Sequence, residues 1–95
     1  MYADVFYAKI EEINTSNGKT IIFIKGLEIN DINSRGAFFF SVDNDTELLW
    51  RNTKIKLSDL KEGQNVSITS IGDVLESSPA KLTKVARVIV LDDEL

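Results

Sequence analysis

The stretch VFYAKIEEINTSNGKTIIFIK at residues 5–25 decides the fold class. It sets two runs rich in β-forming residues on either side of Asn17-Gly18. Asn-Gly between two such runs is the strongest short-range hairpin signal, because both residues accept positive φ angles. The flanking polar residues allow a loop somewhat longer than two residues. The stretch therefore predicts strands over residues 5–13 and 20–25 that pair as an antiparallel hairpin.

A third strand is predicted over residues 37–42, AFFFSV, after a turn-like segment at residues 26–36. Exposed on a sheet edge, this apolar run would be prone to aggregation, so it should lie centrally in a sheet. Side chains alternate between the two faces of a strand. We therefore expect Phe38, Phe40 and Val42 in the core and Phe39 on the outer face.

The second half of the chain continues the β pattern. It predicts a short strand over residues 46–50, one helical turn near residues 57–63 capped by Ser58 or Asp59, and a strand over 65–71 that Gly72-Asp73 interrupts. A loop at Ser77-Ser78-Pro79 follows. The last strand, residues 82–91, should alternate regularly, with Lys84, Ala86, Val88 and Val90 on one face and Val85, Arg87, Ile89 and Leu91 on the other.

This order of elements matches the oligonucleotide/oligosaccharide-binding (OB) barrel. We predict an all-β fold, a small five- to six-stranded OB-like barrel with one short helical turn, as a single domain over residues 1–95. A small open sandwich is the main alternative. At this length the chain has room for one core.

The composition speaks against most enzyme chemistries. The chain has no His and no Cys, which removes the commonest general base, the thiolate nucleophile and the usual zinc ligands. Ser78 and Lys81 have the spacing of a Ser-x-x-Lys nucleophile, but Pro79 denies them a helix. We expect no enzyme, no catalytic residue, no metal and no cofactor.

The net charge and the apolar runs of the chain limit the kinds of partner that it can bind. The net charge of −4, carried partly by Asp92-Asp93-Glu94, makes nucleic acid an unlikely ligand, because phosphate contacts need basic residues. No apolar stretch is long enough for a membrane span, and the N-terminus, Met1-Tyr2-Ala3-Asp4, lacks the basic and apolar regions of a signal peptide. The chain is expected to be cytoplasmic if Met1 is the native start, and extracytoplasmic if a leader was removed.

Two segments carry a family resemblance: DLKEGQNV at residues 59–66 and GDVLESSPA at residues 72–80. With the closing β run VARVIV, they resemble the YobA-like family of bacterial domains of unknown function, over residues 37–91. The resemblance implies an OB-like barrel and no assigned activity. Members commonly follow a leader or lipoprotein signal, which implies an envelope setting.

Six residues are candidate ligand contacts, in two groups. Phe23, Lys25 and Phe39 should share the outer face of the second and third strands, the usual ligand face of OB folds. Trp50, Arg51 and Lys54, with Lys56, join an aromatic ring to cations, as single-stranded nucleic-acid binders do. Against this, Trp50 can simply cover one mouth of the barrel, and Phe39 can be covered by a loop or a dimer partner.

Two acidic groups are better explained as a polar turn and as solvated charge than as a metal site and a catalytic carboxylate pair. Residues 43–47, DNDTE, faintly resemble the start of a calcium loop, but the required Gly is missing and Lys54 holds the twelfth position. Glu11 and Glu12 are adjacent on a strand and should point to opposite faces.

The leading hypothesis is a non-enzymatic binding module, monomeric or homodimeric, that takes a protein, a peptide or an envelope component on the face around Phe39 and on the 72–81 loop. The alternatives are a single-stranded nucleic-acid-binding domain and a structural or dimerising domain.

Overall fold

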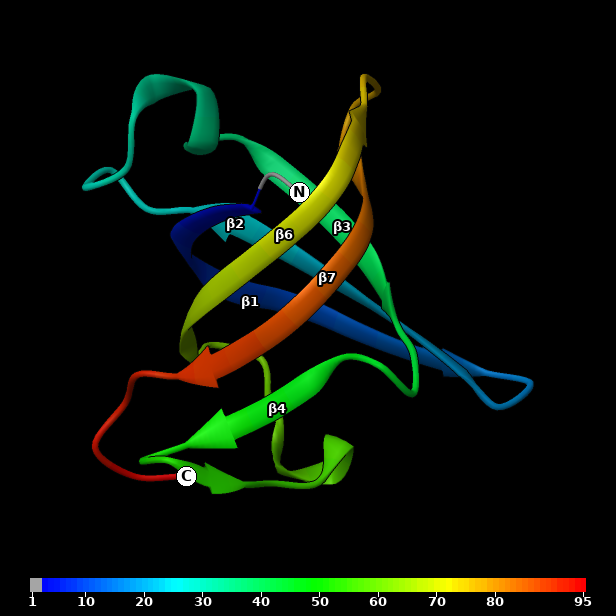
Figure 1. Cartoon of the computed structure of the whole chain (residues 1–95), viewed down its shortest axis with the longest axis vertical. Coiled ribbons are helices and arrows are strands. Elements are labelled where there is room, and N and C mark those ends of the chain that lie inside the picture. Colours follow the sequence, from blue (N-terminus) through cyan, green and yellow to red (C-terminus); the bar gives the residue numbers. More distant parts are fainter. Residues whose placement is uncertain (1–2) are drawn as a thin grey trace.

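The computed structural model describes residues 3–95; Met1 and Tyr2, which enter the one-domain and leader predictions, lie outside the described residues. The described part contains seven strands and two 3-10 turns (Figure 1). Their bounds are β1 Ala3–Ser16, β2 Lys19–Gly26, η1 Ile32–Ser34, β3 Ala37–Val42, β4 Glu47–Trp50, β5 Thr53–Lys54, η2 Leu57–Asp59, β6 Asn65–Leu75 and β7 Ala80–Val90.

Five strands close into a barrel, which confirms the predicted all-β barrel class. Along the sheet the order is β3-β2-β1-β6-β7, and a parallel pairing of β3 with β7 closes it. This closing seam consists of two residue pairs, Phe38 with Ala80 and Phe39 with Lys81. Strands β4 and β5 extend the sheet beyond β7, so the described residues hold two strands outside the barrel. Closure leaves the apolar β3 with a neighbour on each side, as its composition predicted.

The β1–β2 hairpin turns at the predicted residues, with a tighter loop than expected. Asn17 and Gly18 have φ angles of 53° and 75°, which is the two-residue geometry that follows the right-handed twist of paired strands. The register continues to the pair Ser16–Lys19, so the loop has two residues and not the greater length that its flanking residues would allow. Both strands also extend further than predicted.

The core fills the inside of the barrel from alternate positions of each strand. Phe38 and Phe40 are buried and Val42 packs against the core while partly exposed, as the sequence predicted. Leu60, from the segment between η2 and β6, joins them. The other buried apolar residues are Phe6, Ala8, Ile10, Ile22, Ile24, Val66, Ile68, Ala80, Leu82, Val85, Val88 and Val90.

Irregularities in pairing correct the predicted β7 pattern. The register steps from Thr69–Arg87 to Ser70–Val85, so Ala86 is an extra residue that shifts the alternation. Val85 and Val88 are therefore both buried, although strict alternation placed them on opposite faces. β7 also runs from residue 80 to 90, not from 82 to 91.

Two further bulges change the expected ends and faces of strands. Gly72 has a φ of 83°, and the β6 register shifts between Ile71 and Val74. The strand therefore continues through Gly72-Asp73 to Leu75, whereas an interruption was predicted. In β1 the register shifts between Ile10 and Glu12, which leaves Glu11 and Glu12 both exposed.

One end of the barrel is covered by β4, β5 and η2 (Figure 1). Trp50, Ile55 and Leu57 pack against the core there. The predicted helical turn is η2, but its first residue is Leu57, and Asp59 lies at its end and accepts a hydrogen bond from the Lys56 N–H at 3.0 Å. Lys56, and not Ser58 or Asp59, therefore holds the N-cap position, although the Asp59 carboxylate does bond the backbone at the start of the turn. The described chain also has a second turn, η1, that was not predicted.

Candidate functional site

Phe23 and Phe39 form a stacked pair on the outside of the barrel. They are direct partners in the β2–β3 register, with ring centroids 5.6 Å apart and an angle of 27° between the rings. Both rings are half-buried, while their neighbours along the strands, such as Ile22 and Phe40, are buried inside. Phe39 thus lies on the outer face, and the two rings together form an apolar platform.

Three lysines lie around this platform, and the exposed Glu12 of β1 is the register partner of Phe23. Lys25 follows on β2 and lies opposite Lys9 of β1, and Lys81 of β7 is the seam partner of Phe39. Like charges directly across a ladder repel each other. None of the three forms an ion pair with another of residues 3–95. We call Phe23, Phe39, Lys9, Lys25 and Lys81 the aromatic face.

The second predicted group lies elsewhere, on the β4–β5 hairpin. The Trp50 indole N–H donates to the Asp92 carbonyl oxygen at 3.0 Å, and the Arg51 guanidinium lies 4.9 Å from the centre of the Trp50 ring. Arg51 also donates to the Asp93 carbonyl oxygen at 2.9 Å. Lys54 is exposed on β5. The structure therefore divides the six candidates into two separate surfaces, and in the second one the indole and the guanidinium contact each other and the C-terminal segment.

The acidic turn at residues 43–47 forms ion pairs with β7. Lys84 Nζ lies 3.0 Å from Asp43 Oδ2 and 3.5 Å from Asp45 Oδ2, and Arg87 Nε lies 2.7 Å from Glu47 Oε1. The hydrogen bond from Lys84 holds the pKa of Asp43 below its usual 3.8. All three carboxylates of the turn thus have a cationic partner within the protein. Among residues 3–95, no group of three His, Cys, Asp or Glu side chains is placed to hold a metal ion.

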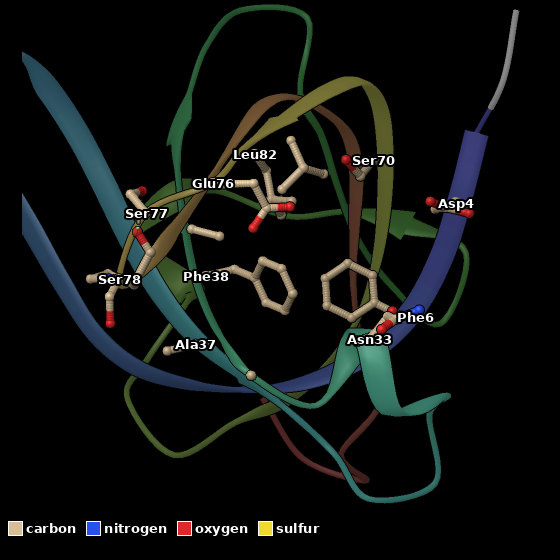
Figure 2. Close-up of a pocket in the computed structure, with 15 residues that line it drawn as sticks. Asp4, Phe6, Asn33, Ala37, Phe38, Ser70, Glu76, Ser77, Ser78 and Leu82 are labelled. Carbon is tan, nitrogen blue, oxygen red and sulfur yellow. Dashed lines mark hydrogen bonds between the residues drawn. The ribbon is translucent and has the colours of Figure 1, made fainter.

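A cavity of about 700 Å³ opens at the end of the barrel away from β4 and β5 (Figure 2). It lies between the loop that contains η1 and the hairpin tip of β6 and β7. Phe6 and Phe38 form its floor, and Asp4 and Glu76 stand at its rim. We call this the mouth cavity. The other residues that line it are Asn33, Ser34, Gly36, Ala37, Ser70, Val74, Ser77, Ser78, Pro79, Ala80 and Leu82.

Sequence reasoning found the 72–81 loop but missed most of these residues. The tip segment Glu76–Pro79 lies within the loop predicted to contact a ligand. Asp4, Phe6 and Ser70 come from β1 and β6, which are distant in sequence but pair directly, with Asp4 opposite Ser70. Lys81 of the aromatic face was missed because β3 and β7 are likewise distant in sequence, and Lys9 was missed because a bulge between Ile10 and Glu12 shifts its register against β2. Alternation along each strand could have assigned their faces, but not their neighbours.

Comparison with known proteins adds no relative. No family model, no curated protein and no solved structure matches the chain. As for membranes, the helical segments within residues 3–95 are all too short to cross a bilayer.

Proposed function

We propose that the chain is a non-enzymatic binding module of OB type and that its partner lies on the aromatic face. The observation that carries the proposal is the stacked pair of Phe23 and Phe39, left half-exposed on the outside of β2 and β3. The strand order supports the OB assignment, since that fold is a five-stranded Greek-key barrel that binds ligands on the face of its second and third strands. The YobA-like resemblance stays a prediction beside it.

The chemistry of the face favours an anionic partner that carries flat rings. A ring can stack on Phe23 and Phe39, while acidic groups neutralise Lys9, Lys25 and Lys81. The partner we place first is an acidic protein or peptide segment with aromatic side chains, which includes a segment of an envelope protein.

Single-stranded nucleic acid is the second candidate. The net charge of the chain speaks against it, but the local arrangement favours it. Three lysines that form no ion pair within residues 3–95 lie around the stacked rings, against the single carboxylate of Glu12 beside Phe23. Stacked bases and backbone-tracking cations are how single strands are held without sequence preference. The lysines, and not the Trp50–Arg51 group, are the cations that this candidate would use.

The test measures fluorescence anisotropy of three labelled probes at about 50 mM and about 200 mM salt. The probes are a peptide of alternating Glu and Phe, an oligothymidylate and a ring-free polyglutamate. Saturable binding of the peptide supports the first candidate, and saturable, salt-sensitive binding of the oligothymidylate supports the second. Equal binding of polyglutamate would overturn the role of the rings, and no binding of any probe would overturn the proposal.

Variants assign the binding to a surface. Phe39→Ala and Lys25→Gln should each weaken binding about tenfold, because each removes a ring or a charge from the platform. Lys54→Gln is the matched control, since it removes an exposed lysine on β5, outside the aromatic face. If Lys54→Gln weakened binding and the other two variants did not, the ligand would lie on the Trp50 group and the aromatic face would be excluded.

A further inference from the structure

The mouth cavity is a candidate site separate from the aromatic face. At about 700 Å³ it falls within the range of small-molecule pockets. Four segments build it: the start of β1, the η1 loop, the start of β3 and the tip of the β6–β7 hairpin. Its wall includes Glu76-Ser77-Ser78-Pro79, the part of GDVLESSPA that the sequence singled out and that the aromatic face does not use.

The floor of the cavity is aromatic. The rings of Phe6 and Phe38 lie side by side, with their centroids 5.3 Å apart and an angle of 53° between the ring planes (Figure 2). Ala80 and Leu82 continue the apolar lining on β7. An alkyl chain can bury its apolar surface against this floor.

A hydroxyl group lies beside this floor without a described partner. Ser70 of β6 is 6% exposed and lines the cavity. It takes part in no side-chain hydrogen bond with another described residue, although every fully enclosed side-chain polar atom among residues 3–95 has a partner. Its oxygen is therefore accessible from the cavity. Buried polar groups are nearly always hydrogen-bonded, so an open hydroxyl at this depth suits a ligand atom.

The rim carries negative charge alone. Asp4 and Glu76 are exposed and line the opening, and Figure 2 shows the Glu76 carboxylate directed into the cavity. Neither forms an ion pair within residues 3–95, and no lysine or arginine is among the residues that line the cavity. A group that enters the cavity thus meets carboxylates, hydroxyls and aromatic rings.

We propose that the mouth cavity binds a small organic cation of the primary alkylamine class. The alkyl part lies over Phe6 and Phe38, and the ammonium group donates hydrogen bonds to the Ser70 hydroxyl and to the carboxylates of Asp4 and Glu76. Each part of such a ligand meets a complementary group: three N–H donors meet acceptors, and the charge meets two carboxylates. An anion is repelled by the same rim.

The test uses the intact chain and three probes that differ in one group: n-butylamine, 1-butanol and butyrate. Amide chemical shifts in nitrogen-15 spectra report binding and place it. We expect n-butylamine to bind about tenfold more tightly than 1-butanol, with shifts at Ala37 and Ser77 and none at Phe23. Equal affinity of the amine and the alcohol, or tighter binding of butyrate, would overturn the proposal.

Three variants and a control sharpen the test. Asp4→Asn, Glu76→Gln and Ser70→Ala should each weaken n-butylamine binding about three- to tenfold, while 1-butanol binding changes little after either carboxylate is removed. Asp73→Asn is the control, because Asp73 is exposed on the same hairpin but does not line the cavity. If Asp73→Asn reduced binding as much as Glu76→Gln, only the general charge of the hairpin would attract the amine, and the site would be disproved. If n-butylamine does not bind in the mouth cavity, the proposal for the aromatic face still stands, because that proposal is tested with different probes and variants.

Discussion

The side-chain amide of Asn30 pairs with both backbone polar groups of Tyr7. The Tyr7 N–H donates to Asn30 Oδ1 at 2.9 Å, and Asn30 Nδ2 donates to the Tyr7 carbonyl oxygen at 2.6 Å. β2 ends at Gly26, so the amide continues the hydrogen bonding of β1 beyond the end of its neighbour. A second bond from Nδ2 to the Ser34 carbonyl oxygen, at 2.9 Å, fixes the η1 loop that forms one wall of the mouth cavity.

Replacing this amide should cost stability. Asn30→Ala leaves the Tyr7 N–H without its partner and removes the link to Ser34, so we expect a loss of about 2–3 kcal/mol in the free energy of unfolding. Urea denaturation followed by circular dichroism measures it. Asn33→Ala, at an exposed position in the same loop, should change stability by less than about 0.5 kcal/mol. Equal effects of the two variants would show that the amide does not hold the loop.

Gly26 and Gly36 should respond oppositely to alanine. A Cβ atom at Gly26 would lie 1.7 Å from the Ser34 carbonyl oxygen, whereas a Cβ at Gly36 would meet no atom within 4 Å. We expect Gly26→Ala to destabilise the protein by about 1–3 kcal/mol, because backbone must move. Gly36→Ala should be neutral or stabilising by up to about 1 kcal/mol. Thermal melts compare the two, and coinciding melting temperatures would contradict the close approach of β2 to the loop.

The Asp43–Lys84 pair predicts a small dependence of stability on acid. The folded-state pKa of Asp43 is lowered by the hydrogen bond from Lys84, so its contribution is present above the ordinary pKa of 3.8 and is lost as the pH falls through the lowered value. The pKa of Lys84 is raised by the Asp43 hydrogen bond, so its contribution is present below 10.5 and is lost as the pH rises through the raised value. Both effects should shrink in salt, because both side chains are partly exposed to solvent.

Urea titrations of the wild type and of Asp43→Asn across the acid range check this. The wild type should lose more stability than the variant as the pH falls below 3.8. Glu62→Gln, which alters an exposed residue with no ion pair to another described residue, should follow the wild type. Parallel curves for the wild type and Asp43→Asn would show that the pair does not contribute.

Phe39→Asp separates ligand binding from self-association. If the aromatic face binds a partner other than a second copy, light scattering should give the mass of one chain, 10.6 kDa, for both the wild type and the variant. Two half-buried rings offer far less area than a stable dimer needs. A dimeric wild type and a monomeric Phe39→Asp would instead assign this face to dimerisation.

Local patterns in the sequence were enough to predict the parts of the fold that depend on neighbours along the chain. Residues 37–42 form the predicted strand with the predicted faces, and Asn17-Gly18 forms the predicted turn. The hairpin at Arg51-Asn52 was missed, although both residues have positive φ angles, because Arg-Asn is not a usual sequence for such a turn. Ala86 could not be recognised as a bulge, since the register against β6 decides which residue is extra.

In the candidate sites, too, contacts between residues close in sequence could be predicted and contacts between distant strands could not. Phe39 was assigned to the outer face from its own strand, and its stacking on Phe23 follows from the antiparallel register of β2 with β3. Lys81 joins them from a strand distant in sequence, and Lys9 lies opposite Lys25 only because a bulge between Ile10 and Glu12 shifts the β1–β2 register, so no local pattern indicates the lysine cluster. The segment DLKEGQNV turned out to be structural: Gly63 and Gln64 exchange backbone hydrogen bonds with Ile10, and the Gln64 side chain bonds the backbone of Lys61 and Asp59.

The seam between β3 and β7 consists of only two residue pairs, so it is a weak point at which the closed barrel can open. Because few hydrogen bonds hold this seam, the barrel should open locally there first. The amide protons of Lys81 and Phe39 should therefore exchange with deuterium sooner than those in the middle of the β1–β2 hairpin. Phe39 and Lys81 also belong to the aromatic face. A partner that bridges these two residues should hold the seam closed. Binding on the outer surface should then slow the deuterium exchange of amide protons at the seam.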